Sequence, residues 1–153
     1  MNHALYILVV DDCAAVRKVL ATVLGAAGHT VVLAEDVVEA LGVLDAQRPD
    51  LILTDYRMPG LSGVELVREV RSRLWLTHIP IIVVSSEQAP ETRSRMARAG
   101  ANGWVAKPIC ATTPLGVVGA VAAGVSAAGG RPAGTLQADG AGADRYSYVC
   151  AGS

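Results

Sequence analysis

Short apolar runs alternate with segments of helical period along most of the chain. The runs have the length of β-strands, which are expected at 5–10, 30–34, 51–54, 81–84 and 103–106. The first, third and fourth runs consist almost wholly of Val, Ile and Leu, as is typical of strands covered on both faces. Amphipathic helices are expected between them and after the last run, at 14–27, 36–47, 62–74, 90–99 and 113–127. This alternation favours a parallel sheet with helices on both sides.

Several of these helices carry recognisable end signals. Ser62 with Glu65 three residues later forms a capping-box pattern at the start of the third helix. Pro90 opens the fourth helix and Gly100 follows its end, which is the usual asymmetry of helix termini. The last expected helix contains three glycines, each of which disfavours a helix by about 1 kcal/mol relative to Ala. That helix is expected to be marginal, either through compositional drift or because a partner completes it.

Acidic residues stand where two of the expected strands end. Asp55 directly follows one apolar run, and Asp11 and Asp12 directly follow another. A carboxylate there is costly unless its charge is used. The carboxyl ends of parallel strands meet at one edge, where three carboxylates repel one another and require a cation. The sequence therefore predicts a magnesium site at this edge, and Ser85 and Lys107 fall at the same edge.

Composition limits the possible partners and location. The chain has 153 residues, 52% of them hydrophobic, which is enough for one domain with a full core. Its net charge of -1 and the lack of a basic cluster argue against nucleic acid and anionic membrane surfaces as partners. Cys13, Cys110 and Cys150 form no CxxC pair, which favours a reduced, cytoplasmic protein. The N-terminus lacks the basic start of a signal peptide.

The C-terminal third has a different character. No charged residue lies between Lys107 and Arg131, a length that could span a bilayer, but the few large aliphatic residues there favour a weakly specified helix over an anchor. We expect a globular domain over 1–128 and a flexible Gly/Ala-rich tail over 129–153. The tip of that tail, 146–150, could dock on another surface, although an unstructured tail is favoured.

Five features of the chain occur together in the order and spacing of one known family. An acidic pair follows the first strand, and a single Asp follows the third strand, with Met-Pro soon after it. A Ser follows the fourth strand, and Lys-Pro follows the fifth strand. They are Asp11-Asp12, Asp55, Met58-Pro59, Ser85 and Lys107-Pro108. The chain resembles the CheY-like receiver domains of two-component response regulators over residues 5 to about 127. The resemblance implies a doubly wound, flavodoxin-like α/β fold with five parallel strands in the order 2-1-3-4-5 and five helices.

The resemblance also implies roles for individual residues. Asp55 is the expected phosphoryl acceptor, a carboxylate that attacks a phosphohistidine. Asp12, Asp55 and the backbone carbonyl of Arg57 are the expected ligands of Mg²⁺, and Asp11 acts through water or as a weaker direct ligand. Such a protein catalyses only its own phosphorylation and dephosphorylation and is not otherwise an enzyme.

A switch follows from the same resemblance. The Ser85 hydroxyl and the Lys107 ammonium are expected to contact the phosphoryl oxygens. The Ser85 hydroxyl is then expected to turn toward the phosphate while Trp104 moves inward, although Trp is bulkier than the Tyr or Phe usual at that position. Residues 90–127 would form the face that a downstream target reads.

Two further positions are expected to tune dephosphorylation. Arg57 and Glu87 lie two residues beyond Asp55 and Ser85, where an opposite-charge pair could screen the phosphate or be of little consequence. The expected phosphoryl donors are a sensor histidine kinase or a histidine phosphotransfer protein. Flagellar motor binding in chemotaxis and a phosphorelay step both remain open as outputs.

Other classes fit the sequence less well. A haloacid-dehalogenase-like phosphatase needs an Asp where Arg57 stands. A dinucleotide-binding domain needs a GxGxxG loop where the first strand leads into Asp11-Asp12-Cys13. An interaction domain that no longer takes phosphate is disfavoured, because all five site residues are present.

Overall fold

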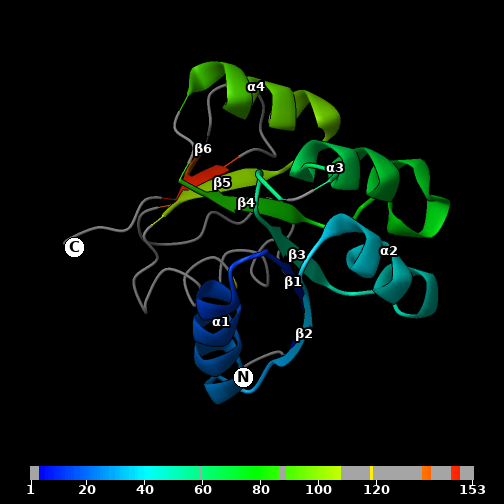
Figure 1. Cartoon of the computed structure of the whole chain (residues 1–153), viewed down its shortest axis with the longest axis vertical. Coiled ribbons are helices and arrows are strands. Elements are labelled where there is room, and N and C mark those ends of the chain that lie inside the picture. Colours follow the sequence, from blue (N-terminus) through cyan, green and yellow to red (C-terminus); the bar gives the residue numbers. More distant parts are fainter. Residues whose placement is uncertain are drawn as a thin grey trace.

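A computed structural model describes residues 4–58, 60–86, 89–107, 118, 136–138 and 146–148 (Figure 1). Five parallel strands occur in the order β2-β1-β3-β4-β5, so the predicted doubly wound topology is confirmed. The strands lie within one residue of the predicted bounds. They are β1 (Tyr6–Val10), β2 (Thr30–Ala34), β3 (Leu51–Thr54), β4 (Ile81–Ser85) and β5 (Gly103–Ala106).

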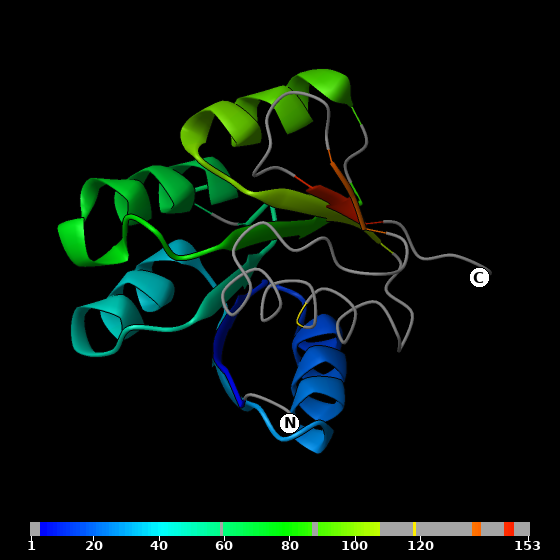
Figure 2. The same cartoon turned by 180° about the vertical axis from the view of Figure 1, so that it is seen from behind.

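Helices cover both faces of this sheet. Helix α1 lies against one face, and α2, α3 and α4 lie against the other (Figures 1 and 2). Their bounds are α1 (Ala14–Ala26), α2 (Val37–Ala46), α3 (Gly63–Ser72) and α4 (Pro90–Ala99), with a single 3-10 turn, η1 (Leu74–Leu76), after α3. The predicted helix at 113–127 lies outside the described residues except for Val118.

The alternation of side chains along each strand divides the core in two. Leu8 and Val10 of β1 pack with α2, α3 and α4, whereas Ile7 and Val9 pack with α1 and Val118. Every residue of β3 and β4 is buried, as expected for strands that are covered on both faces.

The sheet is wider than predicted. Strand β7 (Tyr146–Tyr148) pairs in parallel with β5, and β6 (Leu136–Ala138) pairs antiparallel with β7. These strands lie within 129–153, whose flexible character remains a prediction. Among the described residues, no helix is long and apolar enough to cross a membrane.

The predicted capping box is present at the start of α3. The Ser62 hydroxyl accepts the Val64 N–H at 3.3 Å, and the Glu65 carboxylate accepts the Ser62 N–H at 2.8 Å and also contacts the Ser62 hydroxyl. Gly100 ends α4 with a φ of 123°, which a residue with a side chain rarely adopts.

One arginine ties the far end of α3 to the segments that lead into β4 and β5. The Arg71 guanidinium donates to the carbonyls of Gly100, Thr77 and Ile79 at 2.7–3.0 Å and to the Asn102 side chain at 2.7 Å. Asn102 in turn accepts the backbone N–H of β4 at its first residue, Ile81. This network fixes where both strands begin, and hence where their opposite ends place polar side chains.

Candidate functional site

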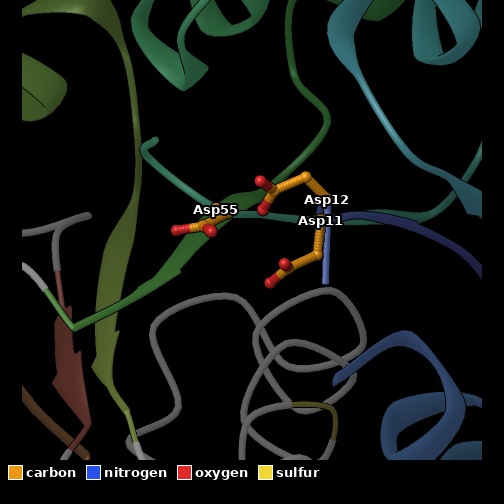
Figure 3. Close-up of side chains that lie close together, drawn as sticks. All are labelled: Asp11, Asp12 and Asp55. Carbon is orange, nitrogen blue, oxygen red and sulfur yellow. The ribbon is translucent and has the colours of Figure 1, made fainter. Parts of the chain in front are cut away.

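Three carboxylates meet at the carboxyl edge of the sheet (Figure 3). Asp11 and Asp12 follow β1, and Asp55 follows β3, which is paired with β1. One oxygen from each of the three side chains lies within 4.8 Å of the others. Asp11 and Asp55 are buried and Asp12 is exposed, so the cluster opens to solvent on the Asp12 side. The predicted convergence of the acids is therefore present.

Backbone groups hold the two buried carboxylates in place. Asp55 donates its N–H to the Val10 carbonyl at 2.8 Å, which continues the β1–β3 pairing up to the site. Asp55 Oδ1 accepts the N–H of Tyr56 at 2.7 Å, and Asp11 Oδ1 accepts the N–H of Cys13 at 2.9 Å. Each buried aspartate thus keeps its second oxygen for another partner.

That partner is Lys107, which directly follows β5. Its Nζ lies 2.9 Å from Asp11 Oδ2 and 3.2 Å from Asp55 Oδ2. Burial lowers the pKa of Lys107, but the hydrogen bond with Asp11 and the charges of Asp55 and Asp11 together outweigh it, so the pKa is raised above the ordinary lysine value. Lys107 is therefore a stable cation at neutral pH.

The electrostatics of Asp11 show the cost of this arrangement. Burial raises the pKa of Asp11 more than the Cys13 N–H and Lys107 lower it, and the nearby charge of Asp55 adds to the increase. The ammonium group of Lys107 pairs with two of the three carboxylates, Asp11 and Asp55, so the three acids together carry more charge than it neutralises. An additional cation would relieve this excess of negative charge.

The loop after β3 passes very close to the start of α3. Gly63 donates its N–H to the Tyr56 carbonyl at 2.8 Å, and a Cβ at Gly63 would lie 2.3 Å from the Asp55 backbone carbonyl oxygen. Only glycine fits there without a shift of the backbone that carries Asp55. This requirement is not predicted above from the sequence, in which the one signal is a glycine directly after the Ser62 cap.

The donor set fits a hard divalent cation. All available side-chain ligands are carboxylate oxygens, which Mg²⁺ prefers, and the exposed side of the cluster leaves room for the waters that Mg²⁺ retains. Arg57 follows two residues after Asp55 in the same loop, and it is exposed.

The remaining predicted residues surround this cluster or lie next to it. Ser85 is the buried last residue of β4, and its carbonyl accepts the N–H of Lys107 at 3.0 Å. Trp104 is only 6% exposed and packs in the core on the α4 side, with the Arg93 guanidinium 5.7 Å from the ring centroid. Glu87 lies outside the described residues, so its pairing with Arg57 remains a prediction.

Comparison with known families agrees with this geometry. The sequence model of the response regulator receiver domain matches residues 7–115. The chain is 37% identical over 106 residues to the chemotaxis protein CheY of Pseudomonas aeruginosa, covering 69% of this chain and 86% of that protein. It is 32% identical to the chemotaxis protein CheY-3 of Vibrio cholerae, covering 74% of this chain and 88% of the relative. The chain belongs to the receiver domain family of response regulators.

Solved structures give the same result. The chemotaxis response regulator CheY4 of Vibrio cholerae matches with a TM-score of 0.74 and 33% identity, over 78% of this chain and 99% of that one. The receiver domain of the sensor histidine kinase PA1611 from Pseudomonas aeruginosa, solved with a magnesium ion in its active site cleft, matches with a TM-score of 0.70 and 29% identity over 76% of this chain and 95% of that one. Receiver domains are phosphoryl acceptors in two-component signalling rather than enzymes with a separate substrate.

Proposed function

We propose that this chain accepts a phosphoryl group on Asp55 from a phosphohistidine of a sensor histidine kinase or a histidine phosphotransfer protein. The observation that carries this proposal is the meeting of Asp55 with Asp11, Asp12 and Lys107 in one cluster. A phosphoryl group brings further negative charge to a site that is already acidic, so the acceptor carboxylate needs cations beside it. Lys107 supplies one, and the acids can hold another.

In the proposed transfer, a carboxylate oxygen of Asp55 forms a bond to phosphorus as the bond from phosphorus to the donor imidazole nitrogen breaks. The imidazole keeps the electron pair of that bond and takes a proton from solvent. The Tyr56 N–H holds the Asp55 carboxylate in orientation throughout. Lys107, cationic and already next to Asp55, is positioned to pair with the oxygens of the transferred group.

The residues proposed to hold Mg²⁺ are Asp12, Asp55 and the backbone carbonyl of Arg57, with Asp11 acting through water or as a weaker ligand. When bound, the ion neutralises charge that develops on the transferring phosphoryl group. The excess of acidic over basic groups around Asp55 supports this assignment.

The switch is proposed to act through Ser85 and Trp104. Ser85 ends β4 beside the site, and Trp104 lies on the neighbouring strand β5. A phosphoryl group that attracts the Ser85 hydroxyl would favour one packing of Trp104 over another and thereby alter the face formed by residues 90–127. Arg57 and Glu87 are proposed to tune the phosphoryl lifetime by controlling access of water.

Control of a partner protein in a chemotaxis pathway is the favoured output, because both sequence relatives described above, those from Pseudomonas aeruginosa and Vibrio cholerae, are chemotaxis proteins. A phosphorelay step is the alternative output. The alternative function is that of an interaction domain that works without phosphorylation. It differs from the chemotaxis output and from the phosphorelay step because Asp55 stays unmodified.

Treatment with acetyl phosphate and Mg²⁺, followed by mass spectrometry, tests the acceptor role. We expect the wild-type chain to gain one phosphoryl group, Asp55→Asn to gain none, and chelation of Mg²⁺ to stop the gain. Asp45→Asn is a matched control, because Asp45 is an exposed aspartate that pairs with Arg73 away from the cluster. If the wild-type chain gains nothing, the proposed function is wrong and the interaction domain is favoured.

A further inference from the structure

In the five-stranded sheet typical of this fold, β5 would be an edge strand. Here the edge is covered, because β7 pairs with it in parallel register, Gly103 with Tyr146, Trp104 with Ser147 and Val105 with Tyr148. Strand β6 then pairs with the outer side of β7. The two views agree that these strands, coloured orange and red, lie beside β5 (Figures 1 and 2).

The direction of the backbone groups of β5 identifies which of them the added strand can use. Lys107, directly after β5, donates its N–H to the Ser85 carbonyl of β4 at 3.0 Å, as the register that pairs Ser85 with Ala106 requires. Because successive residues of a strand direct their backbone groups to opposite sides, those of Gly103 and Val105 also point toward β4, whereas the N–H and the C=O of Trp104 point toward β7. Without β7, these two groups would be free to pair with another strand.

The strand that is covered in this way is connected to the site. It runs directly into Lys107, which contacts Asp11 and Asp55. Beside it lies a small, half-open hollow between α4 and β5, lined in part by Arg93, Met96 and Trp104. Among the described residues, the buried Nε1 of Trp104 has no hydrogen-bond partner. The Trp104 ring is therefore not held by a hydrogen bond of its own side chain within this part of the chain, unlike the carboxylates of the acidic cluster.

We propose that strands β6 and β7 are an intramolecular ligand of the β5 edge, which a partner must displace before it can pair with that edge. The proposal depends on the proposed function in one respect only, namely that residues 90–127 form the face to which a partner binds. Three-residue strands are short, and a two-stranded unit is marginal by itself, so the cover is readily released. The partner suited to the uncovered edge is one that presents an extended segment and adds it as a strand.

Amide hydrogen exchange measured by NMR on the full chain tests the contact. Tyr148→Pro removes the β7 N–H that the register directs at the Trp104 carbonyl, and so breaks the pairing of β7 with β5. We expect exchange at Trp104 to become at least roughly tenfold faster, while exchange at Gly103 and Val105, whose N–H groups point toward β4, is unchanged. Ala151→Pro, beyond β7, is the matched control and should leave all three rates unchanged.

A synthetic peptide of residues 134–150 provides a second measurement. Because the attached segment competes at high effective concentration, the peptide should bind Tyr148→Pro at least about tenfold more tightly than the wild-type chain. Equal binding by both chains, or equal exchange at Trp104, overturns the proposal. Protection that increases with protein concentration also overturns it, because the strand then comes from a second copy. Phosphorylation of Asp55 by acetyl phosphate, measured on the same samples, reports separately on the proposed function.

Discussion

The acidic cluster and the region between α4 and β5 differ in how completely their polar groups are paired. In the cluster, Asp11 and Asp55 each use one carboxylate oxygen for a backbone N–H and the other for Lys107. Between α4 and β5, the buried indole N–H of Trp104 has no partner among the described residues, and a hollow lies beside it. The carboxylates proposed for chemistry are thus held by hydrogen bonds and an ion pair, whereas the indole proposed to respond to them is held by packing alone within the described residues.

The largest change in the free energy of unfolding is expected from Lys107→Met, which removes the cation of the acidic cluster. Removal of the ammonium group leaves the buried carboxylates of Asp11 and Asp55 without their cation, which should cost about 3 kcal/mol of unfolding free energy in urea. Added Mg²⁺ should restore part of the loss, because a cation that binds only the folded cluster stabilises it. Lys18→Met changes an exposed lysine instead and should show neither effect. If Mg²⁺ stabilises neither the wild-type chain nor Lys107→Met, the proposed cation site is contradicted.

A somewhat smaller effect is expected from Gly63→Ala. The new Cβ would meet the Asp55 carbonyl oxygen at 2.3 Å, so the loop must shift, at a cost of about 2 kcal/mol in thermal or urea unfolding. Phosphorylation of Asp55 should slow as well, because the same backbone carries its carboxylate. Gly42→Ala in α2 is the control, since a Cβ there meets nothing within 4 Å and should stabilise the helix by about 1 kcal/mol. Equal stability changes in the two variants would show that the contact at Gly63 is unimportant.

Ser62→Ala should cost about 1 kcal/mol, because the N–H of Val64 loses its cap. The hydrogen bond from Ser62 lowers the pKa of Glu65 more than burial raises it. A carboxyl group with a lowered pKa adds stability above its unfolded-state pKa and loses it as the pH falls through the lower, folded-state value. The wild-type chain should therefore lose part of its advantage over Ser62→Ala in strongly acidic solution. A difference between the two chains that stays constant at all pH values would exclude the Glu65 contribution.

The smallest effect is expected from Trp104→Phe. This change loses packing but also removes a buried N–H that has no partner within the described part of the chain, so the unfolding free energy should change by less than about 1 kcal/mol. Val105→Ala, on the same strand but in the other half of the core, removes no unpaired donor and should cost about 2 kcal/mol. If Trp104→Phe proves the more costly of the two, the region between α4 and β5 is as tightly specified as the acidic cluster.

Much of the fold could be predicted because the strands are buried on both faces. The uninterrupted Val, Ile and Leu of β3 and β4 leave no competing periodicity, and the residue that ends each run is polar because it reaches the edge of the sheet. The same logic located Asp11, Asp12, Asp55 and Lys107. The roles inferred for them came from a family resemblance and not from the pattern alone.

Features that depend on distant contacts could not be predicted in this way. Strands β6 and β7 have no periodic pattern, and β7 exists because the edge of β5 offers it a partner. The Arg71 network joins carbonyls from segments far apart in the chain, which no local pattern records. The large Trp104 ring lies beside a hollow that it lines together with the small residues Ala97, Ala101 and Gly103, which come from three separate segments.

Two neighbouring residues of β5 belong to different halves of the core. Trp104 packs among the residues on the α4 side, and Val105 packs with α1 and Val118. A rotation of the strand about its long axis would therefore push one half of the core while pulling on the other. Strand β5 therefore couples the two helical layers mechanically. A displacement that compresses the packing on the α4 side should loosen the packing on the α1 side, and the reverse.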